Sequence, residues 1–269
     1  VLQANNDITL AAASDIVTNN PSGNGGDLFL KAGRSVTLNS SIVTDDGNLT
    51  IIANDTVANG VVAANRDAGL AAITMANGTA ITAGTGNVDM QLLDGAGHAG
   101  QTAVTGSVLL RSVAAANLAV SAPQGNVQVG DTGATVASNI VLTGTATLES
   151  ATTVALQGGS SGAFAQVSAD NGINVTAPQV TLVNGGSFAR MIVPTGIAPI
   201  TIQGLCDAVS CTVVSAFELT GPNTNLASVV VGGLLSMDPV ISFDPEIKTQ
   251  DAAKKEEPEI AVDAGETCQ

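Results

Sequence analysis

The sequence has no Trp and no Tyr, and it contains one His and five Phe among its 269 residues. Charged residues are also scarce, at 12%, although 45% of the residues are hydrophobic. So many aliphatic residues and so few charges exclude low-hydrophobicity disorder for most of the chain. Thr, Val, Asn and Gly are abundant and form helices poorly, which argues against an ordinary helical enzyme. The composition therefore predicts a β protein with small side chains and many turns.

Basic residues are few: eight Lys and Arg stand against 23 Asp and Glu, for a net charge of −15. Phosphate binding needs clustered Lys and Arg, so a nucleic-acid partner is excluded, and binding to an anionic membrane surface is disfavoured. The acidity fits a soluble extracellular or periplasmic protein. No apolar run is long enough to span a membrane. The chain starts at Val1 without a basic signal region, and we interpret it as a fragment or processed product of something longer.

An internal repeat is the strongest signal in the sequence. Its unit is Gly, a small polar residue, and two aliphatic residues separated by one position. The clear copies are Gly26-Asp27-Leu28-Phe29-Leu30, Gly47-Asn48-Leu49-Thr50-Ile51, Gly86-Asn87-Val88-Asp89-Met90, Gly106-Ser107-Val108-Leu109-Leu110 and Gly125-Asn126-Val127-Gln128-Val129. The intervals between these glycines are nearly equal, except that the one from Gly47 to Gly86 is about twice as long. We interpret this long interval as two periods, with a degenerate copy near Gly69-Leu70.

Short strands with alternating apolar and polar residues follow each unit, separated by Gly, Asn and Asp turns. Three short strands per period without helices predict a parallel β-helix of about 20 residues per coil, in which stacked coils bury the core together. A narrow core of Val, Ile, Leu and Ala needs no large rings, and we expect Thr and Asn at equivalent turns to hydrogen-bond from coil to coil. The alternative is a β-sandwich or barrel, whose turn signals usually recur at shorter, hairpin-like intervals.

Three regions differ in character. Residues 1–175 carry the regular coils, and residues 176–237 read as irregular terminal coils or a cap that protects the open end of the solenoid. Residues 238–269 hold nine acidic residues, three Lys and three Pro, and read as an extended acidic tail.

Three segments of the chain resemble the filamentous-haemagglutinin-like exoproteins, which are two-partner-secretion products of Gram-negative bacteria. They are residues 7–10 (Asp7-Ile8-Thr9-Leu10), 25–38 and 42–51. The likeness extends in repeat style over roughly residues 1–175, and residues 243–269 resemble the carboxy-terminal end of some surface-retained members. The resemblance implies a right-handed parallel β-helix, export through an outer-membrane β-barrel transporter, and an adhesive or structural role at the cell surface.

Three cysteines are the main candidate site residues. Cys206 and Cys211 can close a small disulfide loop, which an exported protein permits; the alternatives are two buried thiols or a metal site, which would lack His ligands. Cys268 is left over as a free or intermolecular thiol. In the high-molecular-weight adhesins of the resembling group, a carboxy-terminal disulfide loop holds the chain in its transporter. The pair here lies well before the end of the chain and departs from that pattern.

The remaining polar residues that could form a catalytic or metal site do not indicate an enzyme. His98 lies in a Gly-rich loop without a nucleophile motif, and we interpret it as an exposed loop residue. Asp45-Asp46 and the pair Asp89 and Asp94 match no calcium motif and are interpreted as turn residues. We expect no catalytic residue, cofactor or metal. Asn-x-Ser/Thr sequons, which arise by composition in such a sequence, occur at Asn39, Asn48, Asn54, Asn77 and Asn174.

The sequence thus predicts a secreted or surface-exposed structural and adhesive stalk of a bacterial exoprotein, with an outer-membrane transporter as partner and a host or neighbouring cell surface as a further one. The alternative is a subunit that self-assembles into a surface filament or surface layer. A polysaccharide-processing β-helix enzyme is the second alternative. It would need clustered carboxylates and commonly aromatic sugar platforms, which this chain is poorly equipped to provide.

Overall fold

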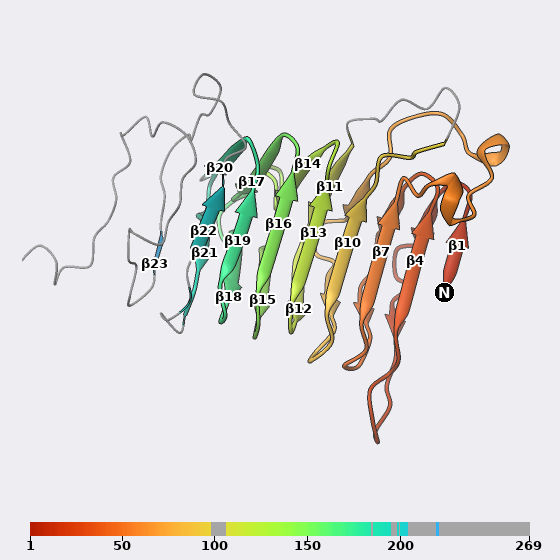
Figure 1. Ribbon diagram of the computed structural model, residues 1–269. Helices are drawn as coiled ribbons and strands as arrows, with labels where there is room; N and C mark the ends of the chain where they lie inside the picture. The colour runs from red at the N-terminus through yellow and green to blue at the C-terminus, as the bar shows by residue number, and fades with distance from the viewer. Residues whose placement is uncertain (98–105, 184, 195–197, 199, 204–218, 221–269) are drawn as a thin grey trace, which may run out of the picture.

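The computed structural model describes residues 1–97, 106–183, 185–194, 198, 200–203 and 219–220. Its strands form three sheets of eight, seven and eight strands, and every strand pair between neighbouring coils is parallel (Figure 1). Successive strands along the chain belong to successive sheets, so each coil contributes one strand to each sheet. The predicted parallel β-helix is confirmed.

The strands of each sheet follow one another along the rod. The first sheet contains β1 (Leu2–Ala4), β4 (Leu28–Ala32), β7 (Leu49–Ala53), β10 (Val88–Leu92), β13 (Leu118–Ala122), β16 (Ala146–Ser150), β19 (Ile173–Thr176) and β22 (Ile200–Gln203). The second contains β2 (Ile8–Leu10), β5 (Val36–Leu38), β8 (Ile73–Met75), β11 (Ser107–Leu110), β14 (Asn126–Val129), β17 (Thr153–Gln157) and β20 (Gln179–Val183). The third contains β3 (Ile16–Val17), β6 (Ile42–Val43), β9 (Ala80–Thr82), β12 (Ser112–Ala115), β15 (Ser138–Leu142), β18 (Ala165–Ala169), β21 (Ala189–Ile192) and β23 (Leu219–Thr220).

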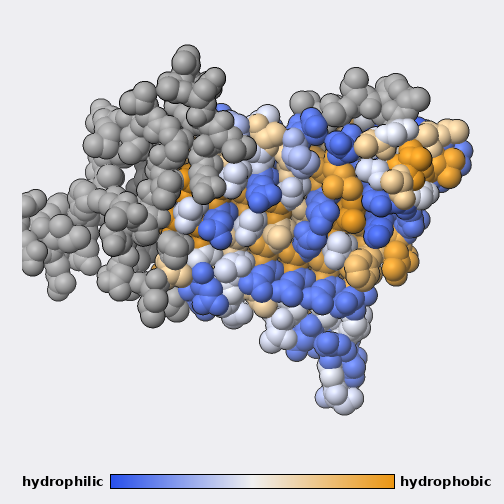
Figure 2. Space-filling model, viewed as in Figure 1, coloured by the Kyte–Doolittle hydropathy of each residue, from blue (hydrophilic) through white to orange (hydrophobic). Residues whose placement is uncertain are grey.

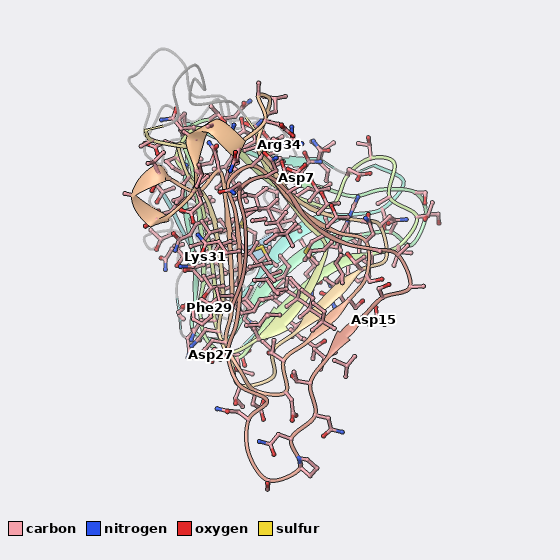
Figure 3. The ribbon with its side chains drawn as sticks, turned by 90° about the vertical axis from the view of Figure 1, so that its right-hand side faces the viewer. Asp7, Asp15, Asp27, Phe29, Lys31 and Arg34 are labelled. Carbon is pink, nitrogen blue, oxygen red and sulfur yellow. The ribbon has the colours of Figure 1, made fainter. Side chains whose placement is uncertain are left out.

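The helix is right-handed, as Figure 3 shows from the N-terminal end of the rod. The chain rises along the first sheet through Asp27, Phe29 and Lys31, crosses the top near Arg34, and descends on the side where Asp15 lies in the first coil. It therefore turns clockwise as it moves away from the viewer. This is the hand that right-twisted strands favour for parallel crossover connections.

Most coils are longer than the spacing of the sequence repeat, although Leu28 pairs with Leu49 and Ser107 with Asn126 at close to that spacing. In the C-terminal half, Ala146 pairs with Ile173 and Ile173 with Ile200, so each of these coils is about a third longer than predicted. The glycine motif marks two different sheets: its copies at Gly26, Gly47 and Gly86 precede strands of the first sheet, whereas those at residues 106 and 125 precede strands of the second. The interval from Gly86 to Gly106 therefore joins two sides of the same coil and is not the length of a coil.

The long interval from Gly47 to Gly86 is one coil with an insertion, so its interpretation as two periods is wrong. Leu49 in β7 pairs directly with Val88 in β10, which leaves no room for a coil between them. Residues 33–35 connect β4 to β5, whereas residues 54–72 connect β7 to β8. This insertion includes two short 3-10 helices, η1 (Val57–Asn59) and η2 (Ala63–Asn65), seen beside β1 and β4 in Figure 1.

Aliphatic side chains stack along the inside of each sheet, as the composition predicts. Inward residues at equivalent positions form continuous ladders that exclude water, and all members of the central ladder of the first sheet from the second coil onward are at most 2% exposed. They are Leu30, Ile51, Met90, Val120, Leu148, Val175 and Ile202. Large rings lie outside this core: Phe164 and Phe188 stack at 4.8 Å at the turns before β18 and β21.

The strand ladders continue beyond residue 175. Strands β20, β21 and β22 pair with β17, β18 and β19 in the same parallel register. Most of residues 204–269, including the predicted acidic tail, lies outside the described part of the chain. The division at residues 175 and 237 stays a prediction.

Candidate functional site

The residues that the sequence singled out for chemistry fall mostly outside the described structure. Cys206, Cys211, Cys268 and His98 all belong to the segments that are not described. The disulfide loop and the free thiol therefore stay predictions.

The acidic pair Asp45 and Asp46 lies in a turn, as interpreted from the sequence. Both residues have positive φ, at 49° and 66°. Each carboxylate accepts a hydrogen bond from a backbone N–H of a neighbouring coil, Asp45 from Asn20 and Asp46 from Thr85 at 2.7 Å. These carboxylates stabilise turns between coils and do not converge on one point.

Asp89 lies within β10, so its interpretation as a turn residue is wrong. It accepts from the amide of Gln91 at 2.6 Å on the same strand, and Asp94 accepts from the N–H of Ala96 at 3.0 Å. Within the described ranges, no group of three or more His, Cys, Asp or Glu is arranged to hold a metal ion.

A ladder of polar side chains runs along the corner between the third and first sheets, and we call it the corner ladder. The amide nitrogen of Asn48 donates to the carboxylate of Asp27 at 3.0 Å, and that of Asn87 donates to the Asn48 oxygen at 3.1 Å. Asn117 donates to Asn87 at 2.7 Å, and the Thr145 hydroxyl donates to Asn117 at 3.1 Å. Figure 2 shows hydrophilic residues along this edge of the first sheet. The predicted coil-to-coil bonding of turn residues is confirmed.

The repeat motif begins with Gly because the backbones of neighbouring coils come into close contact at the position just before each ladder residue. A Cβ atom at Gly47 would lie 2.1 Å from the carbonyl oxygen of Gly26, and one at Gly86 would lie 2.2 Å from that of Gly47. The backbones of successive coils stack so closely here that no side chain fits. Glycine admits this approach, and the next residue supplies the ladder amide.

Polar side chains on the other outer faces also bond along the rod axis. The amide of Gln128 donates to Gln157 at 3.1 Å on the second sheet. On the third sheet, Gln166 donates to Asn139 at 3.2 Å, and the Arg190 guanidinium donates to Gln166 at 2.7 Å. These groups stabilise neighbouring coils against each other.

The insertion is anchored by a buried arginine, which is a structural site that the sequence did not reveal. Arg66 is 6% exposed and donates to the carbonyl of Gly33, to that of Asp67 at 3.0 Å, and to the side-chain oxygen of Asn54 at 2.6 Å. Burial, with the nearby positive charge of Arg34, lowers the pKa of this guanidinium. One signal was present in the sequence: a lone arginine in a stretch rich in Ala and Asn.

An ion pair lies beside this anchor at the first corner of the rod. The Arg34 guanidinium donates to Asp7 at 2.9 and 2.5 Å, and both residues are seen at that corner in Figure 3. Hydrogen bonding to Arg34 lowers the pKa of the Asp7 carboxyl, and the same bond raises the pKa of Arg34. Arg34 also donates to the carbonyl of Ala68 at 3.1 Å, which joins the pair to the insertion.

A second buried arginine lies further along the rod. Arg111, 5% exposed, forms an ion pair with Asp131 and donates to the carbonyl of Met75 at 3.3 Å. Both buried arginines bind backbone carbonyls of a neighbouring coil, so both have structural partners.

The sequons differ in their surroundings. Asn54 is 2% exposed, and its side chain bonds Leu93 and Arg66, so the folded coil offers no access to it. The Asn48 amide belongs to the corner ladder. Asn77 and Asn174 are exposed.

Comparisons with known proteins give no relative: no family model, no curated protein and no solved structure matches the chain. In the part of the chain that the structure describes, no helix is long and apolar enough to cross a membrane.

Proposed function

We propose that this chain is a stalk segment of an exported bacterial surface protein, a stiff rod whose role is structural and adhesive. One observation carries the proposal: the polar side chains outside the core, such as Asn48, Asn87 and Asn117, bond from coil to coil along the axis instead of converging on one point. An arrangement of this kind resists bending and separation of coils, and it repeats along the rod instead of gathering functional groups at one position. An enzyme needs a cluster of functional groups at one position.

The route to the surface is part of the same proposal. The chain is exported through an outer-membrane β-barrel transporter of the two-partner-secretion type, and it works outside the cell. The support is the repeat style of residues 1–175 and the low content of basic residues. Parallel β-strands stacked by local addition of coils also suit a chain that folds as it emerges, because each coil needs only its predecessor as a template.

Surface labelling tests the proposal directly. Antibodies raised against the purified chain should label intact cells of the producing bacterium, and a strain without the transporter should lose that label. Lysed cells of both strains serve as the control for expression. Label that is seen only after lysis, or that persists without the transporter, would contradict the proposed export.

A further inference from the structure

The residue directly before a strand bonds, through its side chain, to the equivalent residue of the following coil. At the second sheet, the N–H of Ser35, which precedes β5, donates at 3.0 Å to the carboxylate of Asp7, which precedes β2. The hydroxyl of Ser35 accepts from the N–H of Ala72, which precedes β8, at 3.2 Å. The side-chain acceptor therefore belongs to the earlier coil in both bonds.

The third sheet repeats this arrangement. Asp15 precedes β3, and its carboxylate accepts from the N–H of Ser41 at 2.8 Å. The hydroxyl of Ser41 accepts from the N–H of Ala80, the first residue of β9, at 3.1 Å. Further along the rod, the hydroxyl of Ser112 at the start of β12 accepts from the N–H of Asn139 in β15 at 3.2 Å.

The first sheet shows the same bonds among residues of the corner ladder. The N–H of Asn48 donates to the carboxylate of Asp27 at 3.0 Å, and the N–H of Asn87 donates to the side-chain oxygen of Asn48 at 2.9 Å. Further along the rod, the N–H of Thr145 donates to the side-chain oxygen of Asn117 at 2.8 Å. All three sheets thus share one kind of bond at the start of their strands.

These side chains, which we call the strand-start acceptors, all point toward the following coil. Those of the first coil lie at separate turns around the rod in Figure 3 and are Asp7, Asp15 and Asp27. Two bonds between a backbone N–H and a side chain run the other way, from Ser14 to Ser40 and from Asn20 to Asp45. Neither of these two acceptors lies directly before a strand. The common direction therefore belongs to the strand starts.

The two partners of such a bond do not depend on it equally. The bonds from the N–H groups of Ala72, Ala80 and Asn139 are partly buried, and a donor left there without a partner costs free energy. The acceptor is a hydroxyl, amide or carboxylate oxygen on a side chain, which can turn toward water when its donor is lost. The following coil therefore needs the bond more than the preceding coil does.

We propose that the strand-start acceptors are positioning residues, by which each coil fixes where the strands of the next coil begin. Ser41 shows the two sides of this role. The preceding coil holds its N–H through Asp15, and its own hydroxyl holds the N–H of Ala80 in the following coil. A defect in such a side chain is passed toward the C-terminal end of the rod and not backward. The inference concerns the assembly of coils and is independent of the proposed surface location.

Amide hydrogen exchange of Ser41→Ala tests this direction. The variant keeps the N–H that donates to Asp15 and loses the acceptor for the N–H of Ala80. We expect the protection factor of the Ala80 amide to fall about 10-fold and that of the residue 41 amide to stay at the parental value. Ser41→Asp is the matched control, because Asp15 is the acceptor at the equivalent position one coil earlier. It should keep the parental protection at Ala80.

Asn117→Ala repeats the test at another sheet. The N–H of Val88 in the preceding coil donates to the backbone carbonyl of Asn117 at 2.9 Å, and the variant keeps this carbonyl. The N–H of Thr145 in the following coil loses its side-chain acceptor. Protection should therefore fall at Thr145 and stay at the parental value at Val88.

Three results would overturn the proposal. Equal loss of protection in the preceding and the following coil would contradict the direction. Unchanged protection of both Ala80 in Ser41→Ala and Thr145 in Asn117→Ala would show that these side chains do not position the next strand. Loss of Ala80 protection in Ser41→Asp as large as that in Ser41→Ala would show that the missing acceptor is not the cause.

Discussion

Single residues at the corners decide how closely the coils of this rod stack. Gly47 lies against the Gly26 carbonyl, and the adjacent Asn48 bonds to Asp27 in the preceding coil. Backbone contact and side-chain bond are therefore supplied by neighbouring positions of one motif. The sequence pattern showed this motif, but only the register shows which residues meet.

Replacement of the corner glycine should be costly. In Gly47→Ala, the new Cβ would lie 2.1 Å from a backbone oxygen, so two coils must move apart. We expect a loss of about 2–4 kcal/mol in the free energy of unfolding, measured by urea denaturation. Gly23→Ala is the matched control, because its nearest contact is the end of the Asn20 side chain at 3.3 Å. Equal losses in both variants would refute the close-stacking explanation.

The corner ladder should be cooperative between neighbours. Asn87→Ala removes a donor to Asn48 and an acceptor for Asn117, and we expect a cost of about 1 kcal/mol. Combined with Asn117→Ala, the loss should be smaller than the sum of the two single losses, because the bond between them is removed by either change. Strict additivity in this double-mutant cycle would mean that the bond between Asn87 and Asn117 contributes nothing.

The ion pair at the first corner predicts a pH dependence. Bonding to Arg34 depresses the pKa of Asp7 in the folded state, so its stabilisation is present above the unfolded pKa and is lost as the pH falls through the folded one. The pair is partly exposed, so the effect stays below about 1 kcal/mol. Asp7→Asn should be less stable than the parent at neutral pH, and this difference should shrink below about pH 4. In an Arg34→Ala background, most of the pH dependence of this stability difference should vanish.

At the scale of elements, the sequence indicated the strands and the fold but not the length of most coils. Alternating segments such as 28–32 and 36–38 are strands with inward Leu30 and Val36, as the pattern indicates. The interval from Gly86 to Gly106 was misjudged as a coil because strands of the first and second sheets begin with the same glycine signal. Turn chemistry depends on local backbone geometry, and that geometry recurs at more than one corner of a coil.

The insertion shows a second limit of the pattern. The repeat pattern predicted a degenerate strand copy within residues 54–72, and yet Val61 and Ala71 are the buried apolar side chains of this segment while η1 and η2 lie outside the sheets. Contacts between residues far apart in the sequence hold the insertion in place. Arg66 donates to the carbonyl of Gly33, and the N–H of Val62 donates to Asn5 at 2.8 Å. No periodicity reports contacts between residues so far apart in sequence.

Loss of the anchor should release the insertion alone. Arg66→Ala leaves the Gly33 carbonyl and the Asn54 side-chain oxygen without this donor, at a cost of about 2–4 kcal/mol to the local structure. Limited proteolysis should then cut first within residues 54–72, with the rest of the rod intact. Arg190→Ala, which removes an arginine on β21 far from the insertion, should keep the parental cleavage pattern. Cuts spread over the whole chain would contradict a local role.

At the scale of the molecule, each coil contacts the coils before and after it, and stability is a sum over such neighbours. Backbone hydrogen bonds between coils report local opening: Leu49 N–H donates to Asn87 at 2.9 Å, and Leu118 N–H donates to Thr145 at 3.0 Å further along the rod. A change at one corner should therefore affect the nearer bond more than the distant one.

Amide hydrogen exchange of the Gly47→Ala variant tests this dependence on neighbours. The Leu49 amide lies next to the changed corner, so its exchange should accelerate at least about 10-fold more than that of the Leu118 amide, because a disturbed coil opens locally. Equal acceleration at both positions would mean that the rod opens as one unit.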